Sequence, residues 1–301
     1  MTSERRIMEE IKNTVAMLNM KGGVSKTTLA VNLAGALAKL WNYRILLVDL
    51  DPQYNATQYL VNLNEFPEYV EGKEPTVLDI LGGVVGGRSV IDGTPIGGKR
   101  EPRIEDLARN LYENERKGGR LDLIPSTLHL INVEGPGFGK EHLLQNFINK
   151  VKRKYNLILI DCPPTFSVFL LSGYLASDYY LVPLKPDPLS TLGISLLEKV
   201  LEAYAPTYNK SIEPLGVVFT MVRDTREMSN VKDTVRRTSA GKRYIFRNSM
   251  SYATAVAEAS RKNVFLFEYN RSWKQGEEIK QITKELIRLI PEGAGVNSKT
   301  D

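Results

Sequence analysis

Cysteine and histidine are scarce in this sequence. The 301 residues include one cysteine, Cys162, and two histidines. A single cysteine excludes a disulfide framework within the chain and any four-cysteine metal or iron–sulfur site that one chain would supply. Such usage fits a reducing, cytosolic setting. Because neither His129 nor His142 lies in a recognisable catalytic motif, we expect Cys162 to pack in the core rather than act as a nucleophile.

Long hydrophobic runs are also missing. Residues 1–11 are charged and lack the apolar centre of a signal peptide, and no later run approaches the length of a membrane span. Hydrophobic residues make up 42% of the chain, which is enough for a sizeable core. The composition therefore predicts a soluble, folded protein of the cytoplasm.

Apolar segments with the lengths of strands alternate with segments that have helical spacing. Strands are predicted at 14–20, 44–49, 121–125, 156–161, 179–184 and 215–221. Helices are predicted at 26–40, 142–155, 189–204 and 276–290. This alternation favours an α/β fold with a doubly wound, mostly parallel sheet flanked by helices.

The loop between the first strand and the first helix carries the most informative residues, Asn-Met-Lys-Gly-Gly-Val-Ser-Lys-Thr-Thr at 19–28. Two glycines let successive backbone N–H groups face inward, and the following helix adds its positive N-terminal dipole. Lys26 is placed to reach the outer phosphates of a nucleotide, and the Thr27 hydroxyl to bind Mg²⁺. The pattern predicts a nucleotide-phosphate site formed by Lys21, Gly22, Gly23, Val24, Ser25, Lys26, Thr27 and Thr28.

This loop departs from the ordinary pattern G-x-x-x-x-G-K-[ST], because Met20 and Ser25 occupy both glycine positions. It fits K-G-G-x-x-K-[ST], with Lys21 five residues before Lys26, and so resembles the ParA/MinD family of deviant Walker A ATPases among the P-loop NTPases. The resemblance implies an ATP-dependent homodimer in which Lys21 reaches the partner's nucleotide, much as an arginine finger does. The alternative is a glycine turn before an ordinary core helix, with two solvated lysines.

Two apolar segments end in carboxylates, at the sheet edge where open α/β sheets bind ligands. The D-C-P-P motif that begins at Asp161 resembles the family's, and a strand-terminal acid opposite a phosphate loop suits a Walker B role, which holds Mg²⁺ through water. The resemblance makes Asp51 the residue that orients the attacking water, with Asp49 and Gln53 as neighbours. Capping of a helix that starts near Ala56 is the alternative for both of these aspartates.

Three further positions are compared with the family. The resemblance implies that Met221, at the end of the last predicted strand, approaches the adenine ring. Relatives usually have glycine where this chain has Tyr54, and commonly read Pro-Arg-Asn where it has Phe-Arg-Asn at 246–248.

A stretch rich in glycine interrupts the alternation, since seven of the seventeen residues at 82–98 are glycine. Helical spacing then predicts a helix at 102–116. We therefore expect one P-loop ATPase domain over residues 1–301, with a glycine-rich and helical insertion at about 82–119.

Positive charge is concentrated in the C-terminal third. The net charge is +5, and residues 223–274 hold twelve Lys and Arg against five Asp and Glu. Such a patch suits sequence-independent contact with phosphate backbones, although basic faces are common on ordinary surfaces. The resemblance favours nonspecific DNA, contacted by Arg223, Arg226, Arg236, Arg237, Lys242, Arg243, Arg247, Arg271 and Lys274.

Taken together, the resemblance implies a nucleoid-associated DNA partition ATPase that hydrolyses ATP to ADP and phosphate with Mg²⁺. Its dimer would bind DNA, and a ParB-like adaptor protein would stimulate hydrolysis and release. The alternatives are a MinD-like membrane-associated positioning ATPase and a ParA-like positioner of a protein cargo. In the last predicted helix three acids balance three bases, which argues against a membrane-surface helix. The single cysteine disfavours an iron–sulfur reductase. The sequence also shows no second group of catalytic residues that would support a ligase-like synthase.

Overall fold

A computed structural model of the chain describes residues 11–61, 74–82, 102–133, 140–223 and 225–290. Within these residues, seven strands form one sheet in the order β3-β4-β2-β5-β1-β6-β7. Neighbouring strands are parallel except for β3 and β4, so the predicted doubly wound, mostly parallel sheet is confirmed. The strands are β1 (Thr14–Met17), β2 (Arg44–Asp49), β3 (Arg109–Asn114), β4 (Gly119–Ile124), β5 (Leu157–Asp161), β6 (Tyr179–Leu184) and β7 (Glu213–Phe219).

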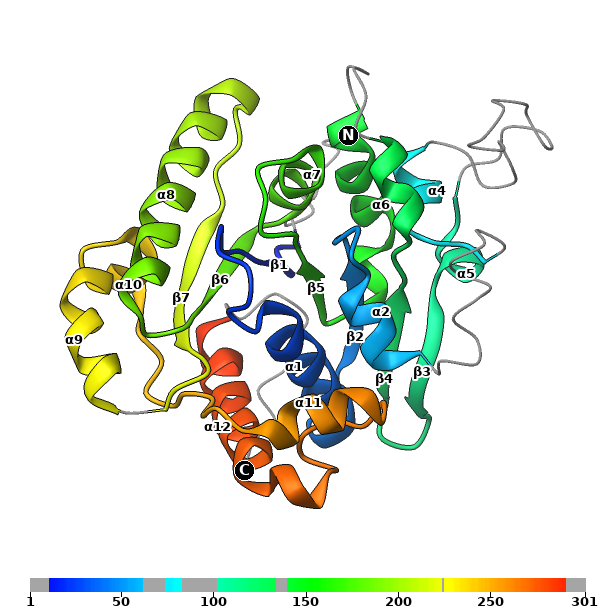
Figure 1. The fold of residues 1–301 in the computed structure, drawn as a ribbon. Helices are drawn as coiled ribbons and strands as arrows, with labels where there is room; N and C mark the ends of the chain where they lie inside the picture. Colours follow the sequence, from blue (N-terminus) through cyan, green and yellow to red (C-terminus); the bar gives the residue numbers. More distant parts are fainter. Residues whose placement is uncertain (1–10, 62–73, 83–101, 134–139, 224, 291–301) are drawn as a thin grey trace, which may run out of the picture.

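Helices cover both faces of the sheet, in two groups that pack on separate apolar cores (Figure 1). The first face carries α1 (Lys26–Leu40), α2 (Asn55–Leu60), α11 (Thr254–Arg261) and α12 (Trp273–Leu289). The second face carries α4 (Val77–Leu81), α5 (Ile104–Leu107), α6 (Leu143–Val151), α7 (Val168–Ala176), α8 (Pro188–Tyr208), α9 (Thr225–Val235) and α10 (Ser239–Arg243). Short 3₁₀ helices lie at η1 (Leu128–Val133), η2 (Lys140–His142), η3 (Lys152–Lys154) and η4 (Asn270–Ser272).

The central strands read as continuous apolar runs because both of their faces are buried. In β1, Val15 and Met17 enter the core under α1 and α12, while Ala16 enters the opposite core. Side chains of successive strand residues alternate between the two faces, so each strand supplies both cores. Cys162, directly after β5, is 1% exposed, which confirms its prediction as a core residue.

The predicted helix at 102–116 is wrong. Only the four residues of α5, Ile104–Leu107, form a helical turn, and its Ile104 and Leu107 side chains are buried in the second core. The chain then becomes β3, an edge strand that pairs antiparallel with β4 and places Leu111 against the first core. Gly118, at φ +81°, lets the chain turn back between the two strands. Pairing with β4 therefore outweighs the helical spacing. Apart from Gly82, the glycine-rich stretch predicted at 82–98 lies outside the described residues.

Candidate active site

The loop between β1 and α1 lies at the carboxyl end of the sheet, with β1 between β5 and β6. Gly23 and Ser25 adopt left-handed φ angles of +70° and +60°, and α1 begins directly after Ser25. Turns of this kind direct successive N–H groups to one side and create a concavity for anions. A Cβ atom placed on Gly22 or Gly23 would meet nothing within 4 Å, so the loop is open above them.

The side chain of Lys26 is held inside this loop. It is 7% exposed, and its Nζ donates a hydrogen bond to the Lys21 carbonyl at 3.0 Å. Burial lowers the pKa of Lys26, whereas the nearby Asp161 and Asp51 carboxylates favour its charged form. An ammonium group in this position is preorganised to meet a phosphate that sits on the loop.

Asp161, at the end of β5, is a buried carboxylate with unsatisfied oxygens. It is 1% exposed, and neither oxygen accepts a hydrogen bond of normal geometry from the described residues. Burial raises the pKa of Asp161 to about 7, although the nearby Thr27 hydroxyl and Lys26 act to lower it. Buried polar atoms seldom stay unpaired, and a carboxylate beside a hydroxyl offers the oxygen ligands that Mg²⁺ prefers. These residues therefore fit Mg²⁺ held partly through water.

No group of three or more His, Cys, Asp and Glu residues in the described ranges could hold a metal ion by itself. A cation at Asp161 and Thr27 would thus need further oxygen ligands from water and phosphate. Mg²⁺ in nucleotide sites usually has this environment.

The two carboxylates after β2 have different surroundings. Asp49 is fully buried, and its Oδ2 accepts hydrogen bonds from the Thr57 N–H and hydroxyl, both at 2.8 Å. It thereby caps the first turn of α2, and burial raises its pKa well above the usual range. Asp51 is 7% exposed, and its Oδ1 accepts the Gln53 N–H at 2.9 Å. Its Oδ2 has no hydrogen-bond partner within the described residues, so this oxygen can accept a hydrogen bond from a ligand or water.

Tyr54 explains why glycine is usual at its position. Its φ and ψ are +43° and 36°, in the left-handed region, immediately before α2 begins. A side chain with a Cβ atom is strained there by about 1–2 kcal/mol, whereas glycine is not. The backbone of this segment thus keeps the conformation that glycine would favour, although the residue is tyrosine.

Lys21 does not point into its own phosphate loop. Its Nζ donates hydrogen bonds to both Asp187 oxygens, at 2.8 and 3.1 Å, and to the Ser190 hydroxyl at 3.0 Å. Partial burial acts to raise the pKa of Asp187, but the hydrogen bonds from Lys21 and Ser190 lower it to about 2. Lys21 is therefore held by the first turn of α8 in this single chain.

Sequence reasoning did not assign Asp187 and Ser190 to the site. A signal was present, because Asp187 precedes Pro188, and an acid before a proline is typical of a helix N-terminus. The fold brings α8 close to the loop, since a Cβ atom on Gly193 would lie 2.8 Å from Asn19 Oδ1.

Met221 lies next to the phosphate loop, just beyond β7. Its φ is +54°, and the preceding Thr220 hydroxyl donates a hydrogen bond to the Val24 carbonyl at 2.8 Å. The end of β7 is thereby joined to the loop. Met221 is half-buried, so its side chain is partly accessible beside this junction.

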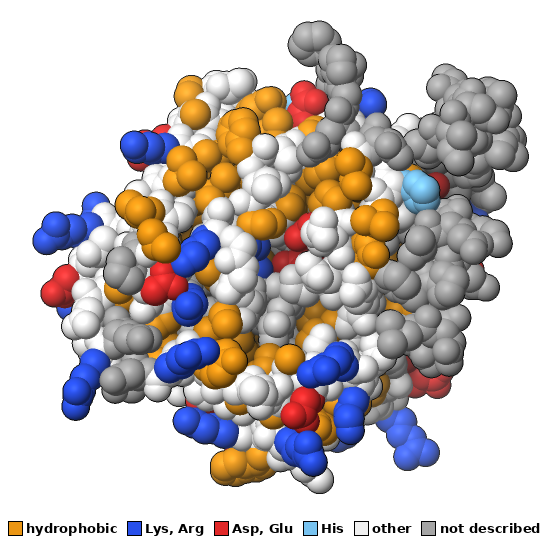
Figure 2. All heavy atoms as spheres, in the orientation of Figure 1, with side chains coloured by type: hydrophobic (Ala, Val, Ile, Leu, Met, Phe, Trp, Pro, Cys, Tyr) orange, Lys and Arg blue, Asp and Glu red, His pale blue; other side chains and the backbone are white. Residues whose placement is uncertain are grey.

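An apolar surface flanks the site. Leu189, Leu192 and Leu196 are 68%, 66% and 52% exposed, and their spacing places them on one face of α8. Phe166, before α7, is 66% exposed. Figure 2 shows hydrophobic side chains gathered over α7 and α8. We call Leu189, Leu192 and Leu196 the α8 apolar stripe, and exposed patches of this kind are typical of interaction sites.

Basic side chains extend over the part of the molecule formed by α9 to α12, and Figure 2 shows Lys and Arg along its lower rim. All nine predicted DNA contacts are exposed. Arg236, Arg271 and Lys274 pair with acids, and Arg223 stacks 4.1 Å from the Tyr252 ring. Four others make no ion pair with a described residue, namely Arg237, Lys242, Arg243 and Arg247.

The prediction did not include Lys284 and Arg288. They line a cavity of about 400 Å³ together with Arg247. The charge count along the sequence missed them because the glutamates of α12 balance its bases. One of these, Glu285, is buried and accepts hydrogen bonds from the Tyr244 hydroxyl and the Arg247 and Asn248 N–H groups, so the cations remain at the surface.

No described helix has both the length and the apolar character that crossing a membrane requires. The apolar side of α12 is also occupied, because Ile279, Ile282 and Leu286 are fully buried in the first core.

Comparison with known proteins gives consistent matches. A family model described as an AAA domain, AAA_31, matches residues 12–214. The sporulation initiation inhibitor protein Soj of Bacillus subtilis is 31% identical over 211 residues, which cover 69% of this chain and 72% of Soj. A ParA family protein of Chlamydia pneumoniae is 26% identical over 283 residues, which cover 92% of this chain and 98% of that protein.

Among solved structures, a putative plasmid partition protein of Borrelia burgdorferi bound to AMPPNP has the same fold. The TM-score is 0.69 at 23% identity, and the match covers 93% of this chain and all of that chain. The sequence relatives and the family model agree with this fold and with the resemblance of the loop motif. The chain therefore belongs to the ParA family of ATPases.

Proposed function

We propose that this protein is an ATP-hydrolysing DNA partition switch, in which ATP joins two copies into a dimer that binds nonspecific DNA. A ParB-like adaptor protein would then stimulate hydrolysis and release. One observation carries the proposal, namely the open phosphate loop with the buried Lys26 ammonium and the unsatisfied Asp161 carboxylate beside it. The ammonium has one hydrogen bond, to a carbonyl, and the carboxylate has none, so a triphosphate and Mg²⁺ would supply the partners that these groups lack.

In this proposal the N–H groups of residues 22–27 and Lys26 Nζ hold the phosphates of ATP. The Thr27 hydroxyl and, through water, Asp161 would hold Mg²⁺, and Met221 would lie against the adenine. When bound, Mg²⁺ draws negative charge from the phosphates. Asp51 Oδ2, which is free to accept a hydrogen bond, orients the attacking water.

The dimer is the second part of the proposal. The α8 apolar stripe supplies apolar area for burial between two copies. Lys21 leaves Asp187 and Ser190 and reaches the partner's nucleotide, where its charge stabilises the transition state. Because α8 carries both the stripe and Asp187, association and release of Lys21 involve the same helix.

Replacing Asp51 with alanine tests the assignment of the hydrolytic residue. We expect the rate of ATP hydrolysis to fall about 10²- to 10⁴-fold, as for loss of a group that positions or activates water. ATP binding, dimer formation and DNA affinity should remain, because Asp51 holds neither phosphate nor DNA. Phosphate release and fluorescent-nucleotide binding measure the two effects. Glu105→Ala, an exposed carboxylate on α5, is the control, and normal turnover in the Asp51 variant would refute the role.

DNA binding is tested by removing adjacent charges. We expect Lys242→Ala with Arg243→Ala to weaken ATP-dependent DNA binding and to reduce the slope of log affinity against log salt by about 0.9 for each phosphate that the variant no longer neutralises. The matched control is Arg116→Ala with Lys117→Ala, at the turn between β3 and β4, where both bases are exposed. Fluorescence anisotropy with ATP, ADP or no nucleotide measures binding. Equally weakened binding in the two double variants would contradict a localised surface.

The same assay separates the alternative functions. A MinD-like protein would bind anionic vesicles, and these would compete with DNA. The buried apolar side of α12 favours DNA over a lipid surface, because a membrane helix needs that side free. A positioner of a protein cargo would share the ATP and DNA steps and differ in the adaptor it recognises.

A further inference from the structure

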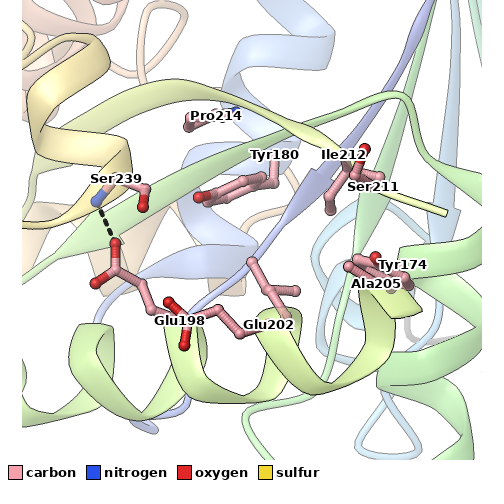
Figure 3. A pocket seen from close by; sticks show the side chains of 10 residues that line it. Tyr174, Tyr180, Glu198, Glu202, Ala205, Ser211, Ile212, Pro214 and Ser239 are labelled. Atoms are coloured by element: carbon pink, nitrogen blue, oxygen red, sulfur yellow. Dashed lines mark hydrogen bonds between the residues drawn. The ribbon is translucent and has the colours of Figure 1, made fainter. Parts of the chain in front are cut away.

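A second pocket lies away from the phosphate loop, between α8, α10 and the edge of the sheet at β6 and β7 (Figure 3). Its volume is about 280 Å³. Acidic, phenolic and apolar side chains line it, among them Tyr180, Glu198, Leu201, Glu202, Ile212 and Pro214. None of these residues has a part in the proposed ATP or DNA sites.

Glu198 and Glu202 give this pocket its negative charge. They are four residues apart on α8 and therefore lie on one face of the helix. Glu198 accepts a hydrogen bond from the Ser239 N–H at the start of α10. Neither glutamate forms an ion pair with a described residue. Because like charges at this spacing repel, a cation placed between them would be stabilised.

A hydroxyl that faces the pocket adds an independent signal. Tyr180 on β6 is 3% exposed, yet its hydroxyl forms no hydrogen bond with a described residue. Figure 3 shows the Tyr180 ring across the floor of the pocket, with its hydroxyl turned toward the side where Glu198 and Ser239 lie. Burial and the Glu198 charge raise the pKa of Tyr180, so it stays a neutral phenol. Because this hydroxyl is not fully buried, it opens onto the pocket, where a ligand can hydrogen-bond to it.

The remaining lining suits an aliphatic stem. Leu201, Ile212 and Pro214 provide apolar contact beside the polar groups. A guanidinium offers five N–H donors in a planar fork and can serve two carboxylates and a phenol oxygen together, which an ammonium point charge does less well. We propose that this pocket binds an arginine side chain of a partner protein, with the guanidinium between Glu198, Glu202 and Tyr180.

Charge and position both support a protein partner. Two carboxylates repel the phosphates of DNA, so the pocket selects a different partner from the one expected at the basic surface. Glu198, two residues after Leu196, lies on the side of α8 nearly opposite Leu196, whereas Glu202 lies about 80° around the helix from Leu192. A bound partner would therefore contact the same helix that carries the α8 apolar stripe. The inference does not depend on ATP hydrolysis or on DNA binding.

The test uses the full chain, labelled with ¹⁵N, and two capped amino acids as probes. N-acetyl-arginine methylamide carries the guanidinium, and N-acetyl-citrulline methylamide is its neutral isostere. We expect the arginine probe to shift the amide resonances of residues 198–205 and 211–214, and the citrulline probe to leave them in place. Glu202→Gln should weaken binding of the arginine probe about fivefold, as expected for loss of one exposed ion pair. Tyr180→Phe should weaken it as well.

Glu115→Gln, an exposed acid at the turn between β3 and β4, removes the same charge elsewhere and should leave binding unchanged. Unaltered spectra of the variants outside the pocket would show that they fold normally. The inference is overturned if both probes bind equally, if neither shifts these resonances, or if Glu202→Gln has no more effect than Glu115→Gln. Agmatine, a small molecule with a free guanidinium group, is the last probe. If it binds tenfold more tightly than the capped arginine, the pocket's ligand is a small guanidinium compound and not an arginine of a partner protein.

Discussion

Replacing Lys26 with alanine is expected to abolish ATP binding. Lys26 Nζ is buried in the phosphate loop, and hydrogen bonds from a charged donor contribute about 1.5–3 kcal/mol each. Loss of two such bonds to phosphate would weaken binding by more than about 100-fold. Isothermal titration calorimetry with ATP and Mg²⁺ measures this directly.

The fold should survive this change. Burial lowers the pKa of Lys26, which means that the folded chain bears a desolvation cost for its charge. The variant without nucleotide should therefore unfold at the same temperature as the parent or a higher one, while the stabilisation added by ATP disappears. Lys117→Ala, an exposed lysine at the turn between β3 and β4, is the control and should keep both the unfolding temperature and the stabilisation by ATP. ATP binding by the Lys26 variant within tenfold of the parent would contradict the proposed phosphate contact.

Replacing Lys21 with alanine should separate nucleotide binding from hydrolysis. In the single chain Lys21 contacts Asp187 and Ser190 rather than the loop interior, so a monomer should bind ADP almost unchanged. A cation supplied across a dimer to transition-state charge is worth about 10³- to 10⁵-fold in rate, and the variant should lose that acceleration. Hydrolysis is measured at protein concentrations where the dimer forms.

Asp187→Asn gives the control for Lys21, because it weakens the contact within the chain and leaves the lysine in place. We expect this variant to hydrolyse ATP at least as fast as the parent, since less free energy is needed to release Lys21. Unimpaired turnover by Lys21→Ala would remove the proposed role in the dimer. A large loss of ADP affinity in that variant would instead show that Lys21 serves its own nucleotide.

The parts of the fold that sequence predicts well are those whose pattern is local. Strands buried on both faces read as apolar runs, so β2 and β6 are predicted to the residue. The edge strand β3 is half-exposed and has no such run. The spacing of Ile104, Leu107 and Leu111, which runs from α5 into β3, is that of one continuous helix. Leu111 nevertheless packs on the other core. Only the pairing with β4, which local spacing does not encode, decides the structure.

The candidate site divides in the same way. Its loop and strand-end acids are contiguous motifs, and the fold brings Lys26, Asp51 and Asp161 together. The contact from Lys21 to Asp187 joins residues 166 positions apart, so no local pattern contains it. The pocket at Glu198 and Tyr180 likewise depends on how α8 packs over β6.

The most direct measurement is the mass in solution of Asp51→Ala loaded with ATP and Mg²⁺, by light scattering after size exclusion. ATP bound between two copies predicts twice the mass of one chain, and a return to one chain with ADP. Adding Leu192→Asp within the α8 apolar stripe should keep the protein a monomer with ATP and with ADP. A single chain that carries bound ATP, at concentrations well above those in the DNA assay, would contradict the dimeric site.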